Sequence, residues 1–415
     1  MQDLAPAQFT WGPALRAAGR DKETTMSIDV AKLRSETPGC ENQAHFNNAG
    51  AALPPKPVLD TVITHLNREA EIGGYEAAAE ASDRLENFYK TAARLVGGLP
   101  QEIAYIENAT RAWDMAFYAI DWQSGDQILT AQAEYAANYI AYLHMAKRRG
   151  VEIIAVPNDE HGQISVSALE ERVTDRTKLI AITHIPTNGG LVNPAAEVGK
   201  IAKAHGILYL LDACQSIGHI PMDVQAIGCD MLSATGRKYL RGPRGTGFLW
   251  VREPIIETLD PPLLDLHAAT LTGPHSYEVR NDARRFENWE SFVAGRLGLT
   301  SAIDYALDLG LDTIRDRIYD LANQLRAELD GLPSVTVCDL GEEKCGIVSF
   351  TVDDHTPAYV KETLSAQQIN IHTSRRTSTL LDMTERGIDA LARASVHYYN
   401  SEEEIDRMIR AIASL

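Results

Sequence analysis

Short apolar runs alternate with segments of helical spacing along most of the chain before Val251. The run Ile207–Leu211 is almost wholly apolar, as expected of a strand that is covered on both faces. Helical spacing follows several of the runs, for example at Ala195–His205. This alternation predicts a mostly parallel sheet with right-handed crossovers. The other predicted strands are Ile103–Ile106, Gln127–Thr130, Glu152–Val156, Lys178–Thr183 and Met231–Ala234.

The pattern changes after Val251. Repeated prolines over Pro254–Pro274 predict an irregular loop. The remaining elements predict a smaller α+β domain at the C-terminus. They are helices near Ala294–Leu309, Asp312–Leu329, Pro357–Gln367 and Glu402–Ala413, and strands at Val335–Cys338 and Ile347–Val352.

The length of 415 residues exceeds what one hydrophobic core usually organises, and 45% of the residues are hydrophobic. We therefore predict an N-terminal arm, a large domain and a small domain over residues 1–45, 46–290 and 291–415. Charges mixed with proline and glycine from Met1 to about Thr25 indicate that the start of the arm is mobile.

Polar side chains gather where two of the predicted strands end. Because the carboxyl ends of parallel strands line the crevice in which α/β proteins bind ligands, these side chains are placed at one site. A hydroxyl, a glycine and two cations in one turn also suit a phosphate group. The residues concerned are Asp212, Gln215, Thr235, Gly236, Arg237 and Lys238.

The pair formed by Asp212 and Lys238 matches a pyridoxal phosphate site. A lysine amine reacts with the aldehyde of this cofactor, and a carboxylate keeps the pyridine nitrogen protonated so that the ring takes up electrons. The alternative is an aspartate that caps a helix and a lysine on the surface. The pair alone does not decide between them.

A second anion site is indicated at Asn108–Arg111, which opens a helix after the strand Ile103–Ile106. Backbone N–H groups at a helix N-terminus and the hydroxyl of Thr110 bind anions well. An ordinary helix cap at Asn108 is the alternative.

The stretches LDACQSIGHIPMDV and CDMLSATGRKYLRGPRGTGFLWV resemble the cofactor core of the class V aminotransferase family. This family of fold-type I pyridoxal phosphate enzymes includes cysteine desulfurases, selenocysteine lyases and isopenicillin N epimerase. Similarity in order and spacing extends from about Phe46 to the C-terminus. The resemblance implies an α/β fold with a mostly parallel, seven-stranded type of sheet in the large domain and a smaller α+β C-terminal domain.

The resemblance also implies roles for individual residues. Lys238 and Asp212 are the expected catalytic residues, and no metal ion is expected. Tyr135 stands where the family usually has a histidine stacked on the pyridine ring. The family's asparagine beside the cofactor oxygen aligns with either Thr187 or Asn188. The implied cofactor ligands are Ala109, Thr110, Tyr135, Thr187, Asn188, Asp212, Gln215, Thr235, Arg237 and Lys238.

Four further residues are expected at the substrate. Arg393 occupies the position of an arginine that binds the substrate α-carboxylate in relatives, and Asn48 lies in a loop near the substrate. Arg375 and Arg376 lie on the loop that presents the cysteine of desulfurases. They suit an anionic group at the far end of the substrate, although a solvated basic pair explains them equally well.

Two departures from the family bear on the reaction. The loop His372–Ser378 holds no cysteine, and Thr377 stands about where a desulfurase has one. Trp289-Glu290 replaces a glycine–threonine turn that contacts a partner subunit's phosphate in desulfurases. The sequence therefore favours a β-eliminating carbon–sulfur lyase on a cysteine-derived substrate. Transamination and epimerisation are the alternatives, and a true cysteine desulfurase is less favoured.

The composition of the chain indicates which partners and which compartment to expect. A net charge of −18 disfavours a nucleic-acid partner, and no apolar run reaches the length of a membrane span. We expect a cytoplasmic homodimer with its active sites at the interface, because segments such as Gly73–Tyr75 face a second subunit in relatives. The five cysteines form no CxxC pair and indicate a reducing compartment: Cys40, Cys214, Cys229, Cys338 and Cys345.

A protein that only senses pyridoxal phosphate is the alternative from another class. Family regulators of that type carry a basic helix-turn-helix before the enzyme-like domain, and the 45 residues that precede the similarity are too few for one. The set of Lys238, Asp212 and Arg393 favours catalysis instead.

Overall fold

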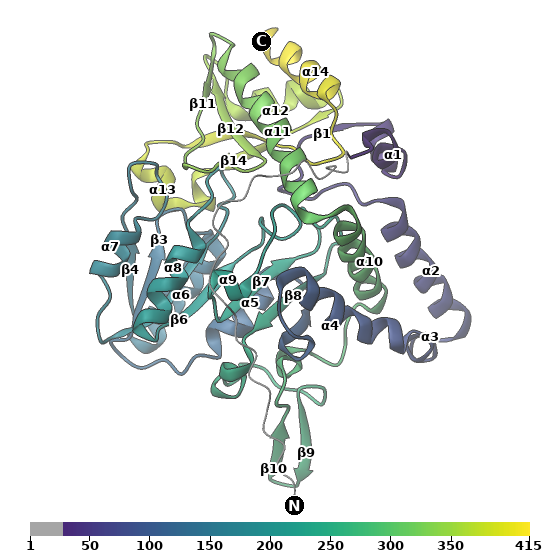
Figure 1. Ribbon diagram of the computed structural model, residues 1–415, viewed down its shortest axis with the longest axis vertical. Coiled ribbons are helices and arrows are strands. Elements are labelled where there is room, and N and C mark those ends of the chain that lie inside the picture. Colours follow the sequence, from purple (N-terminus) through teal and green to yellow (C-terminus); the bar gives the residue numbers. More distant parts are fainter. Residues whose placement is uncertain (1–27) are drawn as a thin grey trace, which may run out of the picture.

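A seven-stranded sheet forms the centre of the larger domain (Figure 1). Its strand order is β2-β8-β7-β6-β5-β3-β4, in which β8 runs antiparallel to both its neighbours and the other pairs are parallel. The predicted mostly parallel sheet is confirmed. The strands are β2 (Ile103–Ile106), β3 (Gln127–Ala131), β4 (Glu152–Val156), β5 (Thr177–Thr183), β6 (Leu208–Asp212), β7 (Met231–Thr235) and β8 (Gly247–Val251).

Both faces of this sheet are buried, which explains its continuous apolar runs. Along β6, Tyr209 and Leu211 enter one hydrophobic core and Leu210 enters the other. The first core also takes side chains from α4 (Ser82–Val96), α7 (Val166–Glu171), α8 (Ala195–His205) and α10 (Val293–Leu309). The second takes them from α5 (Ala109–Tyr118) and α6 (Ala136–Arg149). Each fully buried aliphatic side chain contributes roughly 1.5–3 kcal/mol, so the sheet is a rigid support for its loops.

The smaller domain holds an antiparallel sheet of order β11-β12-β15-β14, which lies beside α11, α12 and α14 (Figure 1). The first core continues into this domain through residues such as Ile347 and Ile405. The predicted α+β character is confirmed. The elements are α11 (Leu311–Asp330), β11 (Val335–Val337), β12 (Ile347–Val352), α12 (Pro357–Ala366), β14 (His372–Arg375), α13 (Leu380–Glu385), β15 (Ala390–Ser395) and α14 (Glu402–Ala413).

The structure, a computed structural model, describes residues 28–415. The mobile segment predicted from Met1 to about Thr25 lies outside the described residues. The end of the predicted arm forms α1 (Val30–Ser35) and β1 (Ala44–His45), and β1 pairs in parallel with β13 (Ile369–Asn370) of the small domain. Residues 28–45 thus pack on the C-terminal domain, while the domain boundaries at 45 and 290 remain predictions.

Two local predictions differ from the structure. Within the expected loop Pro254–Pro274, β9 (Ala269–Gly273) pairs with β10 (Ser276–Val279) in a hairpin that projects from the large domain (Figure 1). Prolines precede β9 and occupy the turn after it, so they flank the strand without interrupting its hydrogen bonds. The Gly73–Tyr75 segment is also more regular than a loop. Gly73 ends α2 (Lys56–Ile72) with φ +104°, and α3 (Gly74–Glu80) starts at once.

The last helix of the large domain, α9 (Val224–Ile227), is a short turn between β6 and β7. Among the helices of residues 28–415, none is both long and apolar enough to cross a lipid bilayer.

Candidate active site

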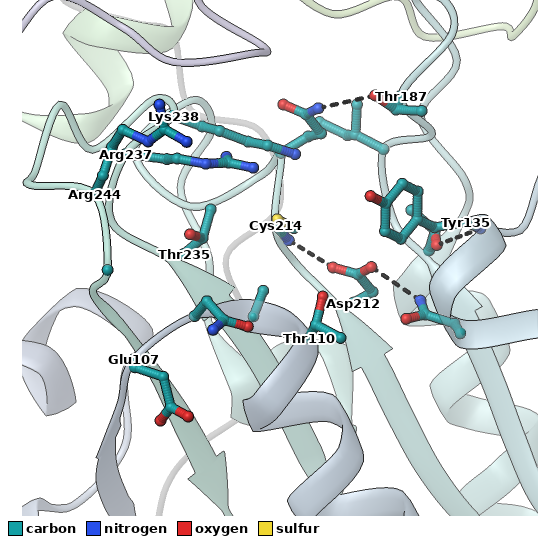
Figure 2. Close-up of a pocket in the computed structure, with 17 residues that line it drawn as sticks. Glu107, Thr110, Tyr135, Thr187, Asp212, Cys214, Thr235, Arg237, Lys238 and Arg244 are labelled. Atoms are coloured by element: carbon teal, nitrogen blue, oxygen red, sulfur yellow. Dashed lines mark hydrogen bonds between the residues drawn. The ribbon is translucent and has the colours of Figure 1, made fainter. Parts of the chain in front are cut away.

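A cavity of about 240 Å³ opens at the carboxyl ends of the central strands, between β6, β7 and the first turns of α5 and α6. Figure 2 shows Asp212 and Thr110 at its base, with Tyr135 on the side opposite Thr235 and Arg237. The structure brings together all of the predicted cofactor ligands except Asn188. Those that line the cavity are Ala109, Thr110, Tyr135, Thr187, Asp212, Gln215, Thr235, Arg237 and Lys238.

Asp212 ends β6 with only 4% of its surface exposed. One carboxylate oxygen accepts a hydrogen bond from the backbone N–H of Cys214 at 2.9 Å, and the other accepts one from the side-chain amide of Asn138 at 3.0 Å. Burial raises the pKa of this carboxyl group, and its two hydrogen bonds and Lys238 oppose that rise. A cationic group in the cavity would therefore stabilise the ionised form of Asp212.

Lys238 follows β7 in the turn that also carries Arg237, and it is 8% exposed. Burial lowers the pKa of its amine, and Arg237 and Arg393 lower it further, while Cys214 and Asp212 oppose them. A lowered pKa leaves more of the amine neutral, which is the form that attacks an aldehyde or accepts a proton.

Hydroxyl groups and cationic side chains line the part of the cavity near the N-terminus of α5. Asn108 caps α5 by accepting from the N–H of Arg111 at 3.0 Å, so the predicted helix cap is present. The hydroxyl of Thr235 and the guanidinium of Arg237 line the same end as the α5 N-terminus. Arg237 donates only to the carbonyl of Gly50, at 3.1 Å, and has no carboxylate partner within residues 28–415. This end offers donors and positive charge to an anion.

Thr187 and Asn188 separate in the structure. The hydroxyl of Thr187 accepts from Arg393 at 2.9 Å and from the amide of Gln215 at 3.4 Å at the cavity wall. Asn188 instead turns toward the small domain, where it donates to the hydroxyl of Thr379 at 2.8 Å. The position of Thr187 fits the predicted ligand, and Asn188 lies outside the cavity lining.

Arg393 lies beside Thr187 on β15 and is only 3% exposed. Its guanidinium donates to the Thr187 carbonyl at 2.7 Å and to the side chain of Asn47 at 3.2 Å, while its Nε has no partner in the described structure. Burial lowers the pKa of this guanidinium to about 10. A buried cation without a carboxylate is costly, so the arrangement favours an anionic ligand.

None of the four predicted substrate residues, Arg393 included, is among the residues that line the cavity. Asn48 is fully buried and donates to the carbonyls of Ser395 at 2.7 Å and His45 at 3.0 Å. Arg376 pairs with Asp389 and donates to the carbonyl of Ile388. Arg375 is exposed on the adjoining strand end. Their substrate roles remain predictions.

Several cavity residues had no predicted role at the site. Asn138 lines the cavity and donates to Asp212 and to Glu134, which lies outside the lining. Arg244 lies beside Arg237 (Figure 2). Cys214 also lines the cavity, as a thiol whose pKa is raised by burial. Glu134 and Asn138 are four residues apart at the point where a predicted strand is followed by a helix. This spacing places both side chains on one face of the helix start and is the sequence pattern that could have indicated them.

The residues fit pyridoxal phosphate on their own chemistry. A buried amine, a buried carboxylate, and a group of cations and hydroxyls line one cavity, and these are the groups that an aldehyde, a ring nitrogen and a phosphate require. With the seven-stranded sheet, this defines a fold-type I pyridoxal phosphate enzyme. The family model described as Aminotransferase class-V matches residues 44–408, and the chain belongs to this family.

Comparisons with individual proteins agree with the family. A probable cysteine desulfurase from Methanothermobacter thermautotrophicus is 28% identical over 381 residues, which cover 90% of this chain and 94% of the relative. The apo cysteine desulfurase of Thermococcus onnurineus NA1 has a TM-score of 0.88 at 26% identity and covers 94% of this chain and 98% of its own. The cystine C-S lyase C-DES, solved with cysteine persulfide, shares the fold with a TM-score of 0.83 at 24% identity, over 91% and 99% of the two chains.

Proposed function

We propose that this chain is a carbon–sulfur lyase that eliminates the β substituent of a cysteine-derived amino acid. One observation carries the proposal. A buried lysine and a buried carboxylate line one cavity, and the buried guanidinium of Arg393, which has no carboxylate partner in the described residues, contacts Thr187 of the cavity wall. The loop His372–Ser378 holds no cysteine, and the family resemblance puts Thr377 about where a desulfurase has one.

Pyridoxal phosphate would be held by residues of the large domain. Asp212 would accept from the ring nitrogen, Tyr135 would cover the ring, and Thr110, Thr235 and Arg237 would bind the phosphate. When bound to Lys238, the cofactor supplies an electron-withdrawing ring that stabilises negative charge at the substrate Cα.

Arg393 orients the substrate in this proposal. Its guanidinium pairs with the α-carboxylate, because the planar fork matches a carboxylate and its Nε is free. The hydroxyl of Thr187 and the side chain of Asn47 hold the guanidinium in place. Fixing the carboxylate at one end presents Cα to the amine of Lys238.

Lys238 moves the proton. Its Nζ, with a pKa lowered by burial, accepts the proton from Cα once the amine is free. Departure of the sulfur substituent from Cβ then completes an elimination, in which the C–S bond breaks and its electron pair leaves with the thiolate. Hydrolysis of the remaining enamine product gives pyruvate and ammonia.

Sulfur transfer to the protein is disfavoured by the cysteines present. A desulfurase needs a mobile thiolate above the substrate, and Cys214 is the cysteine that lines the cavity among the described residues. Burial raises its pKa, and it lies two residues after Asp212, just past the end of β6. A thiol with a raised pKa is mostly protonated and therefore a poor nucleophile.

We also propose that the enzyme is a homodimer. Tyr75 and Trp289, from the two segments expected to face a partner, are exposed and line one cleft of about 920 Å³. Glu107 belongs to the lining of both this cleft and the active-site cavity. Exposed aromatic side chains beside an active site favour a protein interface, and a second copy would close the cavity on this side.

Transamination and epimerisation begin with the same proton removal, so products must separate the three reactions. The test is a panel of amino acids and cysteine conjugates assayed in parallel for pyruvate, keto acid, alanine and the inverted enantiomer. Pyruvate formed in step with the released thiol supports the lyase. A keto acid that keeps the β substituent, an inverted amino acid or alanine as the main product contradicts it.

A further inference from the structure

A second buried carboxyl group lies directly behind Asp212. Glu134 follows β3, just before α6, and is 2% exposed. Two backbone N–H groups donate to it, from Tyr135 at 2.8 Å and Thr183 at 3.1 Å. The side chains of Thr130, Thr183 and Asn138 also donate to it. Glu134 therefore ties the end of β3, the end of β5 and the first turn of α6 together at the cavity.

Asn138 joins the two carboxyl groups. Its side-chain nitrogen donates to Glu134 at 2.9 Å and to Asp212 at 3.0 Å. An amide nitrogen carries two hydrogens, so one hydrogen serves each carboxylate and neither is left over. The direction of the hydrogen bond to Asp212 thus depends on Glu134 accepting the other one.

We propose that Glu134 is a positioning residue of the cofactor site, which orients Asp212 through Asn138 and whose ionisation is coupled to the positive charge that Asp212 binds. The inference rests on the proposed binding of pyridoxal phosphate beside Asp212. It extends that proposal to a residue that does not line the cavity and that the cofactor does not touch.

The charges around Glu134 are all acidic or neutral. The groups that face it are Asp212 on β6, the phenol of Tyr142 on α6, and the hydroxyls of Thr130 and Thr183. Within residues 28–415 no lysine or arginine forms an ion pair with it. Burial raises the pKa of Glu134 to about 7, although its hydrogen bonds with Thr183 and Asn138 oppose the rise, and the charge of Asp212 adds to it.

A cation bound beside Asp212 opposes the rise in the pKa of Glu134. It attracts the charge on Glu134 through Asp212 and lowers the pKa of Glu134, so the carboxyl group gives up a proton when the cofactor binds. By linkage, the cofactor binds more tightly above the pKa of Glu134, where the carboxylate is already ionised, than below it. The effect appears in binding and does not require turnover.

The experiment compares the apoenzyme with two variants. Glu134→Gln keeps the size of the side chain but removes the ionisation and half of the acceptors. Glu102→Gln is the matched control, because Glu102 is 3% exposed and accepts from Trp250 at 2.9 Å and from two backbone N–H groups, but lies outside the cavity lining. The dissociation constant of pyridoxal phosphate is measured by equilibrium dialysis from pH 6 to 8.5.

We expect the control to keep the wild-type pH profile. Glu134→Gln should bind pyridoxal phosphate about 10-fold more weakly and lose the step near pH 7 that the control retains. The apparent pKa of the bound cofactor's visible band should shift in the same variant. If Glu134→Gln does not fold, Asn138→Ala tests the same bridge; it removes a hydrogen bond that lowers the pKa of Glu134, so it should move the step to higher pH and weaken binding.

Two failures can be told apart. A wild-type protein that does not bind pyridoxal phosphate at all overturns the proposed function, and this inference with it. A wild-type protein that binds it, with an unchanged affinity profile and visible band in both Glu134→Gln and Asn138→Ala, overturns the inference alone.

Discussion

The carboxyl edge of the large-domain sheet and the loop of the small domain beside it are built in opposite ways. At the edge, Asp212 and Thr235 are buried, and Asp212 is held by hydrogen bonds from two sides. On the loop, Arg375 is exposed and Arg376 pairs with an exposed aspartate, Asp389. The two regions meet where the N–H of Asp382, in α13, donates to the carbonyl of Gln132.

We infer that the edge and the loop serve different functions. Groups fixed in a core keep their positions when surface residues change, so the edge suits the cofactor chemistry that a whole family shares. Exposed loops accept substitutions at little cost in stability, so the loop suits the choice of substrate and reaction. In the proposed assignment, the chain departs from the desulfurase pattern on the loop, at Thr377, and keeps the lysine and aspartate at the edge.

Replacing the central lysine should have the largest effect. Lys238→Ala removes both the amine that bonds the cofactor and the base for the Cα proton, so activity should fall by more than about 10³-fold. The visible band of the covalently bound cofactor should vanish, and any pyridoxal phosphate that remains should be bound without a covalent bond. A borohydride-reducible adduct that persists in this variant would show that another amine carries the cofactor.

The second largest effect is expected at Arg393, the residue proposed to bind the substrate carboxylate. Arg393→Lys keeps the charge but loses the planar fork, so kcat/KM should fall about 10- to 100-fold, with most of the loss in KM. Pyridoxal phosphate affinity should stay near the wild-type value if Arg393 binds the substrate, as proposed. An unchanged KM together with weakened cofactor binding would place Arg393 at the cofactor instead.

The third effect is expected at the cleft lined by Tyr75 and Trp289. Trp289→Asp puts a charge into the proposed interface, so it should shift the protein toward monomer in analytical ultracentrifugation and lower activity several-fold at low protein concentration. Tyr359→Asp, which changes an exposed aromatic residue of α12, is the control and should leave the assembly unchanged. A fully active monomer in the wild type would contradict interface active sites.

The loop arginines should give the smallest effect. Arg375→Ala should lower kcat/KM by about 2- to 5-fold if the substrate carries a distal anion, because an exposed cation is screened by water. Arg376→Ala should have a smaller effect, since its side chain already pairs with Asp389. If neither variant changes kcat/KM with the best substrate, the loop is only a cover.

Sequence patterns predict the edge far better than the loop. Ile207–Leu211 and Met231–Ala234 predict strands whose ends hold Asp212 and Thr235, because continuous apolar runs fix both the strand and the point at which it stops. Prolines were misleading for β9, since a proline in a turn does not prevent the strand before it.

Contacts between distant segments could not be predicted in the same way. The network of Glu134, Asn138 and Asp212 joins residues 74 positions apart through one amide, and no local pattern encodes that meeting. The separation of Thr187 from Asn188 depends on the small domain, which draws Asn188 toward Thr379. Alignment alone left these two neighbours equivalent.

The most direct test of the proposed reaction is the ratio of pyruvate to alanine formed from cysteine and from an S-substituted cysteine by the purified holoenzyme. Elimination breaks the C–S bond with its electron pair leaving on sulfur, so the substituted substrate should give pyruvate, ammonia and one free thiol per turnover, with little alanine. Alanine as the main product, with sulfur transferred to an added thiol, would contradict the account and assign the chain to desulfuration despite Thr377.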